Sequence, residues 1–245
     1  MNESLIHNNL DKDPQARRRG PKRDRRKLIA IAEAARQVLT AQGPRLTQVA
    51  DVAKTAGVAA GTVYVYVAEK EALIELALLT AARFDLPEGD RPVPFSAARL
   101  EAVASEALAR RLRWPVLQEA LGSPPTAETL RGLLAEAYDL LNRERLLIAL
   151  LDRCARETAV LEALWFAGAR HRFFDDFETA LRRLAEAGLL RRDIDLAAAA
   201  RATLEMLVWM AMRRTGDPEP PRCDEAEARR AAIALATGGL AARAA

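Results

Sequence analysis

Residues 46–70 read LTQVADVAKTAGVAAGTVYVYVAEK, and this stretch decides the fold. Its first half predicts a short helix for which Thr47 is a candidate N-cap. One side of that helix is apolar and consists of Val49, Val52, Ala53 and Ala56. Gly57 supplies the left-handed residue that ends the helix, and Val58 fills the turn. A second short helix from about residue 59 to residue 66 completes a helix-turn-helix, in which the second helix enters the DNA major groove.

At these residues the chain resembles the TetR-type (tetracycline repressor) family of bacterial transcriptional regulators. The matching residues, spread over roughly residues 26–80, are Thr47, Ala56-Gly57-Val58, Gly61-Thr62-Val63-Tyr64, Tyr66-Val67 and Lys70-Glu71-Ala72-Leu73. The resemblance implies an all-α protein with an N-terminal three-helix helix-turn-helix DNA-binding domain and a C-terminal helical ligand-binding and dimerisation domain. This chain departs from the family at Ala59 and Ala60, where a polar pair is usual, and at Val67, where Phe is usual. The departure predicts less direct base reading at the start of the recognition helix.

The DNA contacts are expected from the recognition helix, its flanks and the basic segment before it. These candidates are Arg17, Arg18, Arg19, Lys22, Arg23, Thr47, Gly61, Thr62, Tyr64, Tyr66 and Lys70. A tyrosine hydroxyl can donate to a phosphate, and its ring can contact a thymine methyl group. Gly61 would let the DNA backbone approach closely, and Lys70 lies near the start of the next helix, where phosphate is attracted. A place in the three-helix core is the alternative for either tyrosine.

Positive charge is concentrated at one end of the chain. Residues 12–27 carry nine Lys or Arg and two Asp, a net charge of +7, whereas the chain from residue 86 onward carries 23 basic and 24 acidic residues. This asymmetry indicates a polyanionic partner for the N-terminal end. Gly20 and Pro21 interrupt the basic run, which favours an extended arm along phosphates or in a minor groove. The alternative is a solvated charged tail.

The helices around the helix-turn-helix follow from apolar spacing and from Gly and Pro. A first helix is expected from Asp24, its cap, to about residue 41, ended by Gly43-Pro44. Its apolar stripe consists of Leu28, Ile31, Ala35, Val38 and Leu39. A linking helix is expected from residue 70 to about 84, and a break follows at residues 86–94, which are rich in Pro and Gly. We therefore predict an arm at 1–23, a DNA-binding domain at 24–85 and a ligand-binding and dimerisation domain at 86–245.

The C-terminal part reads as further helices at about 96–112, 127–153, 158–187, 196–214 and 224–241. Its aromatic residues suggest a small-molecule pocket between helices, since such pockets are mostly apolar with a few polar groups. The candidate ligand-binding residues are Trp114, Tyr138, Trp165, Phe166, His171 and Phe174. Ordinary core packing is the alternative for each aromatic residue and for His171, and Cys154 is expected to be an inert buried thiol.

A dimer interface is implied by the resemblance, because the last long helices of this family pair across a two-fold axis. The candidate interface residues are Phe177, Leu181, Leu184, Leu204, Leu207, Val208 and Ala211. The apolar stripe alone is equally consistent with an internal core.

Composition and motifs exclude several other classes. The chain has no G-x-S-x-G, G-x-G-x-x-G, phosphate-binding loop, H-E-x-x-H or paired C-x-x-C, and His7 and His171 lie far apart. We therefore expect no enzyme, no metal site and no cofactor. With no signal peptide and no long apolar run, a cytoplasmic protein is expected. The leading interpretation is a homodimeric repressor that binds a palindromic operator and is released by a largely apolar small-molecule inducer. The alternative is a helical ligand-binding or dimerisation module with weakened DNA contacts.

Overall fold

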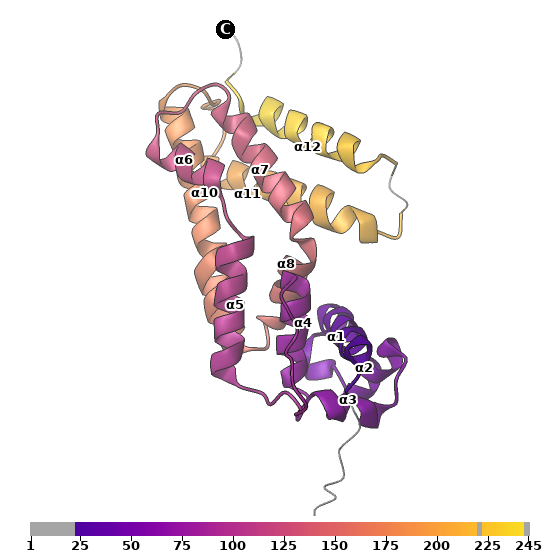
Figure 1. Cartoon of the computed structure of the whole chain (residues 1–245). Helices are drawn as coiled ribbons and strands as arrows, with labels where there is room; N and C mark the ends of the chain where they lie inside the picture. Colours follow the sequence, from indigo (N-terminus) through magenta and orange to yellow (C-terminus); the bar gives the residue numbers. More distant parts are fainter. Residues whose placement is uncertain (1–22, 220–221, 243–245) are drawn as a thin grey trace, which may run out of the picture.

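The structure is a computed structural model that describes residues 23–219 and 222–242. Its N-terminal helices are α1 (Arg25–Leu46), α2 (Val49–Ala56), α3 (Ala60–Tyr66) and α4 (Ala72–Ala82), grouped at the lower end of Figure 1. The helices above them are α5 (Ala97–Arg111), α6 (Pro115–Gly122), α7 (Thr129–Arg143), α8 (Arg145–Cys154), α9 (Ala159–Leu164), α10 (His171–Glu186), α11 (Leu196–Val208) and α12 (Glu225–Leu240). The fold is therefore all-α, with a helix-turn-helix domain followed by a larger helical part, as predicted.

Helix α1 forms because one of its sides is apolar and its start is capped. Leu28, Ile31 and Leu39 are buried, and the Arg26 N–H donates to Asp24 Oδ1 at 2.9 Å, which confirms Asp24 as the cap. The regular backbone breaks at Gly43, with φ 78° and ψ 170°, and a last turn runs through Pro44. The predicted stop at Gly43-Pro44 is thus a break inside the helix.

The prediction that Thr47 caps α2 is wrong. The Thr47 hydroxyl donates to the Gly43 carbonyl at 2.7 Å, so this residue closes α1 instead, and it is only 1% exposed. Gln48 takes the N-cap position of α2, and its backbone N–H donates to the Asp51 carboxylate at 3.1 Å. The hydrogen bond from Thr47 to Gly43 of α1 decides that Gln48, and not Thr47, caps α2. The capping preferences of the residues around α2 do not reveal this bond.

Helix α4 is the central element of the lower part. Ten of its eleven residues are buried, and it packs against α1, α5 and α8. It begins at Ala72 rather than at Lys70, and it ends at Arg83, which adopts the left-handed conformation with φ 58°. The buried residues of α4 thus join the helix-turn-helix domain and the larger helical part in one continuous hydrophobic core.

The connection between α4 and α5 is tied back to the end of α3. Val93 N–H donates to the Tyr66 carbonyl at 2.8 Å, and Ala68 N–H donates to the Val93 carbonyl at 2.9 Å. The predicted break at residues 86–94 does separate two helices. Because the buried core continues across α4, the domain boundary at residue 85 stays a prediction.

Two expected helical segments differ from the structure. The sequence analysis places no helix between residues 112 and 127, but α6 lies there, with Pro115 in its first turn. The Glu136 carboxylate caps α6 by accepting from the Val116 and Leu117 N–H groups at 2.8 and 2.9 Å, and no local pattern reveals this partner. The segment predicted as one helix over 127–153 is divided at Glu144 into α7 and α8.

The segment predicted as one helix over 158–187 is also divided. Gly168 has φ −103° and ψ −105°, and a π-helical turn η1 (Trp165–Arg170) joins α9 to α10. A second π-helical turn, η2 (Trp209–Arg213), follows α11. The N-cap of α11 is Asp195, which accepts from the Ala198 N–H at 2.8 Å. Within the described ranges, no helix is long and apolar enough to cross a membrane.

Candidate nucleic-acid interface and ligand cavity

The turn between α2 and α3 has the conformation that a helix-turn-helix requires. Gly57 is left-handed, with φ 68° and ψ 34°, as predicted. Val63 and Tyr66 anchor α3 in the core, which turns the opposite side of this seven-residue helix outward. The α2–α3 unit lies at the end of the molecule away from α12 (Figure 1).

The outward side of α3, which we call the reading face, consists of Ala60, Gly61, Thr62 and Tyr64. Tyr64 is 50% exposed and Thr62 is half-buried. A Cβ built on Gly61 would meet nothing within 4 Å, so the space beside this residue is open. The side chains of Ala59 and Ala60, next to Gly61, are only methyl groups. The polar side chains of the reading face are therefore those of Thr62 and Tyr64.

Tyr66 is a core residue in this structure, as one of the sequence alternatives stated. It is 3% exposed, and its hydroxyl donates to the Asp24 carbonyl and accepts from the Asp24 N–H, both at 3.0 Å. The hydroxyl therefore holds the start of α1 against the end of α3. Burial removes both Tyr66 and Thr47 from the surface that DNA could reach.

Two of the predicted DNA-contacting cations hold the protein backbone. The Arg23 guanidinium donates to the Val65 and Gly89 carbonyls and lies 5.3 Å from the centre of the Tyr66 ring. Lys70 Nζ donates to the Pro44 carbonyl at 3.2 Å and is half-buried. The other predicted cations, Arg17, Arg18, Arg19 and Lys22, lie outside the described residues.

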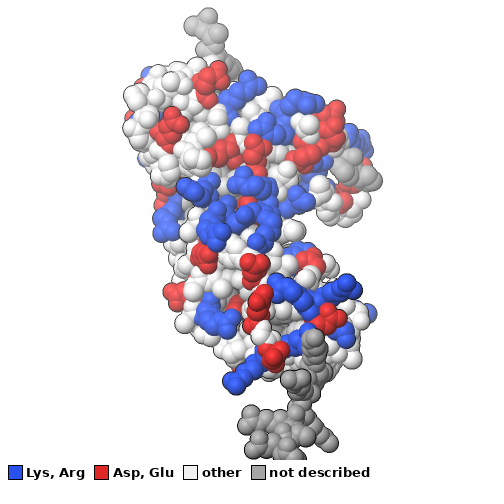
Figure 2. All heavy atoms as spheres, in the orientation of Figure 1, with Lys and Arg blue, Asp and Glu red and all other residues white. Residues whose placement is uncertain are grey.

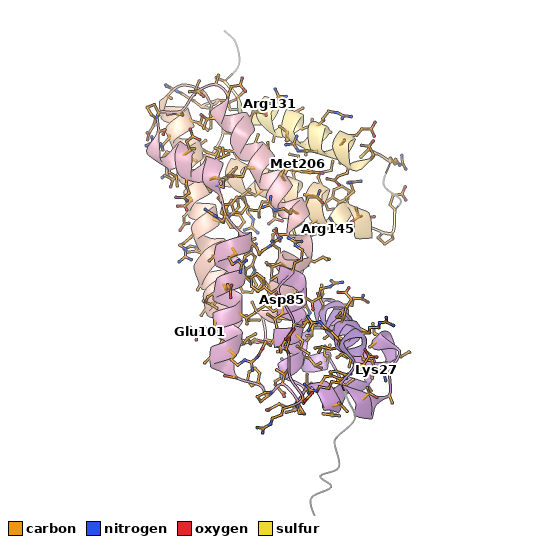
Figure 3. The ribbon with its side chains drawn as sticks, viewed as in Figure 1. Lys27, Asp85, Glu101, Arg131, Arg145 and Met206 are labelled. Carbon is orange, nitrogen blue, oxygen red and sulfur yellow. The ribbon has the colours of Figure 1, made fainter. Side chains whose placement is uncertain are left out.

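The start of α1 contributes exposed cations that were not among the predicted contacts. Arg25, Arg26 and Lys27 are all exposed, and Arg25 lies 3.7 Å from Glu88. Lys27 lies in the lower part of the molecule (Figure 3). Cations at a helix N-terminus oppose the helix dipole, and this unfavourable placement in the sequence already suggests a nearby phosphate as compensation.

A cavity of about 530 Å³ lies among α5, α8, α10 and α11. Trp114 and Phe173 stack in its wall with their ring centres 4.1 Å apart. Of the predicted ligand-binding residues, the cavity wall includes Trp114, Trp165 and Phe174. The Trp165 indole N–H donates to Asp152 Oδ1 at 2.7 Å, so a residue of α8 orients one wall of the cavity.

Both π-helical turns contribute to this cavity. Trp165, Gly168 and Arg170 of η1 line it, as do Met212 and Arg213 of η2. Single π-helical turns inside α-helices are frequent at functional sites. Because two of them line this hollow, it is the candidate ligand site of the described residues.

The remaining predicted ligand-binding residues lie elsewhere. Phe166 and His171 line a smaller, open hollow of about 280 Å³ between α10 and α11. His171 is exposed, with Nε2 lying 3.3 Å from Asp175 Oδ2. Tyr138 is fully buried, and its hydroxyl donates to Glu225 at 2.8 Å. Burial together with that carboxylate raises the Tyr138 pKa far above its ordinary value, so this residue joins α7 to α12 and does not reach the cavity.

The predicted dimer residues are mostly internal. Phe177, Leu181, Leu184, Leu204, Leu207 and Ala211 are at most 3% exposed in the single chain, and only Val208 of the set is half-buried. They pack α10 and α11 into the chain's own core, as the internal-core alternative requires. Exposed small residues lie on a different side of α11, at Ala197, Ala198 and Ala202.

Helix α8 connects the two parts through ion clusters near both of its ends. Before its first turn, the buried Glu144 carboxylate accepts from Arg83, Arg111 and Arg143 at 2.5–3.2 Å. At its last turn, Arg153 donates to the Gln42 carbonyl and to Glu157, whose other oxygen accepts from the Arg45 N–H at 2.8 Å. Figure 2 shows Lys and Arg side chains gathered over the middle of the molecule, in the region of α5, α7 and α8.

Cys154, at the end of α8, is fully buried. Burial raises the pKa of its thiol to about 12, so the reactive thiolate is scarce at neutral pH. This agrees with the expected inert thiol.

Comparison with known proteins supports the reading of the N-terminal helices. Residues 31–77 match the sequence model of a family described as "Bacterial regulatory proteins, tetR family". None of the curated proteins matches the chain.

The fold is shared with solved structures of low sequence identity. The ketosteroid transcriptional regulator KstR2 of Mycobacterium tuberculosis is 18% identical with a TM-score of 0.56, and the match covers 91% of this chain and 98% of that one. A TetR-family regulator from Streptomyces coelicolor A3 is 22% identical with a TM-score of 0.56, covering 86% and 90%. AibR, solved in complex with isovaleryl coenzyme A and operator DNA, is 18% identical with a TM-score of 0.51, covering 85% and 97%.

Proposed function

We propose that this chain is a ligand-responsive transcriptional repressor of the tetR type, because residues 31–77 match the sequence model of that family of bacterial regulatory proteins and the fold is shared with solved regulators. It would act in the cytoplasm, bind a palindromic operator as a homodimer and leave the operator when a small molecule fills the cavity. AibR, which shares the fold, was solved with both operator DNA and a small molecule, which supports the same pair of partners here.

The reading face is the observation that carries the proposal. Gly61, Thr62 and Tyr64 lie on the exposed side of α3, inside the segment that matches the family. The absence of a side chain at Gly61 would let α3 come close to the floor of the groove, where Tyr64 would meet a phosphate or a thymine methyl group. Arg26 and Lys27 would neutralise phosphates beside the groove, together with the basic arm of residues 1–22.

The second copy of the chain would pack on the exposed side of α11. Ala197, Ala198 and Ala202 permit two helices to approach closely, and Trp209, 45% exposed, supplies a large apolar side chain beside them. Two-fold pairing would place two reading faces about 34–36 Å apart, one turn of the DNA helix. Mass measurement by light scattering should give a dimer for the wild type and a monomer for Ala198→Glu. The control is Ala231→Glu on the exposed side of α12.

Helix α8 would transmit the ligand signal together with α4. Ile148 and Asp152 line the cavity, whereas Arg153 holds the backbone of α1. A ligand that displaces α8 would therefore move the α1 corner and, through Glu144 and Arg83, the end of α4. The spacing of the two reading faces would change, and the operator would be released.

The test is binding to the DNA that flanks the chain's own gene, measured by fluorescence anisotropy with nonspecific competitor DNA. We expect sequence-selective, sub-micromolar binding. Tyr64→Ala should weaken it, whereas Leu235→Ala, at an exposed apolar position of α12, should not. Binding that remains entirely nonspecific and salt-sensitive would overturn the repressor proposal.

One observation favours a second function. Ala59 and Ala60 leave the start of α3 without polar side chains, which suits a helical ligand-binding or dimerisation module with weakened DNA contacts. Ligand binding and dimerisation without selective DNA binding would support that module.

A further inference from the structure

The body of the cavity is apolar and partly aromatic. Its wall includes aliphatic side chains from α5, α7, α8 and α11 and the stacked pair Trp114 and Phe173. Its volume of about 530 Å³ lies in the range of drug-sized ligand sites. An apolar chain or ring system is therefore the chemistry that the interior fits.

Aromatic walls can also recognise cations, but here guanidinium groups already occupy positions against the rings. Arg170 and Arg201 each lie 4.9 Å from the centre of the Phe174 ring. Arg170 also lies 5.9 Å from the Phe166 ring centre. A cationic ligand would be repelled by these groups, and the Phe174 ring in the cavity wall already interacts with two guanidinium groups.

The charged side chains of the cavity wall are three arginines and three carboxylates, namely Arg170, Arg172, Arg213, Asp152, Asp176 and Glu205. Asp152 accepts from the Trp165 indole, Glu205 pairs with Arg201 at 2.6 Å, and Arg170 is held by the aromatic rings.

The other three charged side chains of the cavity wall have no such partner. Among the described residues, Arg172, Arg213 and Asp176 have neither a side-chain hydrogen bond nor an ion pair. Two guanidinium groups from separate elements, α10 and η2, thus line the cavity without a partner among the described residues, together with one such carboxylate on α10. Because both arginines are exposed, they lie at the rim and not in the apolar interior.

We propose that the effector is an anionic amphiphile, whose apolar body fills the cavity and whose carboxylate or similar anionic group lies against Arg172 and Arg213. This inference rests on the proposed function, in which the cavity is the effector site. Guanidinium groups suit such a head group because they form charge-assisted, bidentate hydrogen bonds with carboxylates.

The test compares three ligands that share one tail and differ in the head group. Calorimetric titration of the full chain with dodecanoate, dodecan-1-ol and dodecyltrimethylammonium, each below its critical micelle concentration, gives three dissociation constants. We expect dodecanoate to bind about ten-fold or more tightly than the alcohol, as a charge-assisted hydrogen bond allows. The quaternary ammonium compound should bind most weakly.

Substitution identifies the groups responsible. Arg172→Gln combined with Arg213→Gln should lower dodecanoate affinity to that of the alcohol and leave alcohol binding unchanged. Arg182→Gln is the control, since this arginine is exposed on the same helix as Arg172, pairs with Glu178 and does not line the cavity. A thermal unfolding curve checks that each variant is folded.

The inference is overturned if the alcohol or the ammonium compound binds as tightly as dodecanoate, if no compound binds, or if the double variant keeps the preference. Operator binding, measured on the same preparation, tests the proposed function separately from the ligand class. Dodecanoate that binds the cavity without releasing the operator would support the ligand class and contradict the inducer role in the proposed function.

Discussion

The guanidinium of Arg153 occupies the space that a side chain at Gly43 would need. A Cβ built on Gly43 would lie 2.5 Å from Arg153 Cζ, and the backbone there has φ 78°. Arg153 reaches this position from α8 to donate to the Gln42 carbonyl. One glycine therefore satisfies two requirements, a left-handed backbone and the close approach of the larger helical part to α1.

Gly43→Ala should lower the free energy of unfolding by at least about 2 kcal/mol, because backbone strain of this kind costs roughly 1–3 kcal/mol and Arg153 must also move. Urea unfolding measures the change. Gly238→Ala is the matched control, since a Cβ there meets nothing within 4 Å in α12. Equal effects of the two substitutions would refute the assigned role of Gly43.

Gly61→Ala should separate folding from DNA binding. The site is helical and open, so alanine should raise stability by up to about 1 kcal/mol through helix propensity. The added methyl group should nevertheless hold α3 away from the groove and weaken operator binding by about ten-fold, which corresponds to about 1.4 kcal/mol. Chemical denaturation and anisotropy on one sample measure both quantities, and unchanged operator affinity would show that no close approach occurs at Gly61.

The two tyrosines of α3 should respond in opposite ways to removal of the hydroxyl. Tyr66→Phe should cost about 1–3 kcal/mol of stability, because the Asp24 N–H and carbonyl would both be left without this partner. Tyr64→Phe should leave stability within about 0.5 kcal/mol of the wild type and weaken operator binding. Each variant is the control for the other, and a stability decrease confined to Tyr64→Phe would reverse the assignment.

Removing residues 1–22 should weaken operator binding several-fold and reduce its salt dependence. The truncation spares Arg23, whose bonds to Val65 and Gly89 belong to the fold. The plot of log affinity against log salt should become shallower by about 0.9 for every phosphate that the arm neutralises in the full chain. The measurement is a salt titration of both proteins. Superimposable titrations would exclude a role for the arm.

Glu75 should make stability depend on pH in a predictable direction. Burial raises the pKa of its carboxyl above the ordinary 4.5, and only partial compensation comes from Arg99. One carboxylate oxygen, Oε2, has no hydrogen-bond partner among the described residues. Above pH 4.5 the folded state therefore retains a proton that the unfolded state has released, so stability falls as pH rises from 4.5 through the folded-state pKa.

Glu75→Gln should remove that dependence. The free energy of unfolding of the variant, relative to wild type, should be higher at pH 7 than at pH 4.5, as urea titrations at the two pH values would show. Glu33 is the control, because Arg36 lowers its pKa and the sign for Glu33→Gln should be reversed. A pH-independent difference for Glu75→Gln would contradict the role of burial.

The sequence predicted what depends on local pattern. The α1 stripe, the Asp24 cap, the Gly57 turn and the extent of α3 all follow from residues within one or two helical turns of each other. It could not predict partners far along the chain. Glu136 caps α6 from twenty residues away, and Tyr66 bonds to Asp24 across forty-two.

The site was predicted in part for the same reason. Periodicity showed that the apolar stripes of α10 and α11 are buried but not whether the same chain or a second copy buries them. Trp114, Trp165 and Phe174 could be proposed from composition. Their grouping around one cavity depends on the two π-helical turns, which helical periodicity does not reveal.

Helix α4, with neighbours on every side, has a consequence for regulation. Because ten of its eleven residues are buried and it packs against α1, α5 and α8, a displacement of α4 caused by a ligand in the cavity would also shift the side chains that it contacts in α1. The same coupling would act in the opposite direction, from the operator to the cavity. Since linkage is reciprocal, the operator-bound protein should bind its ligand with lower affinity than the free protein does. The factor should equal that by which the ligand lowers the affinity for the operator.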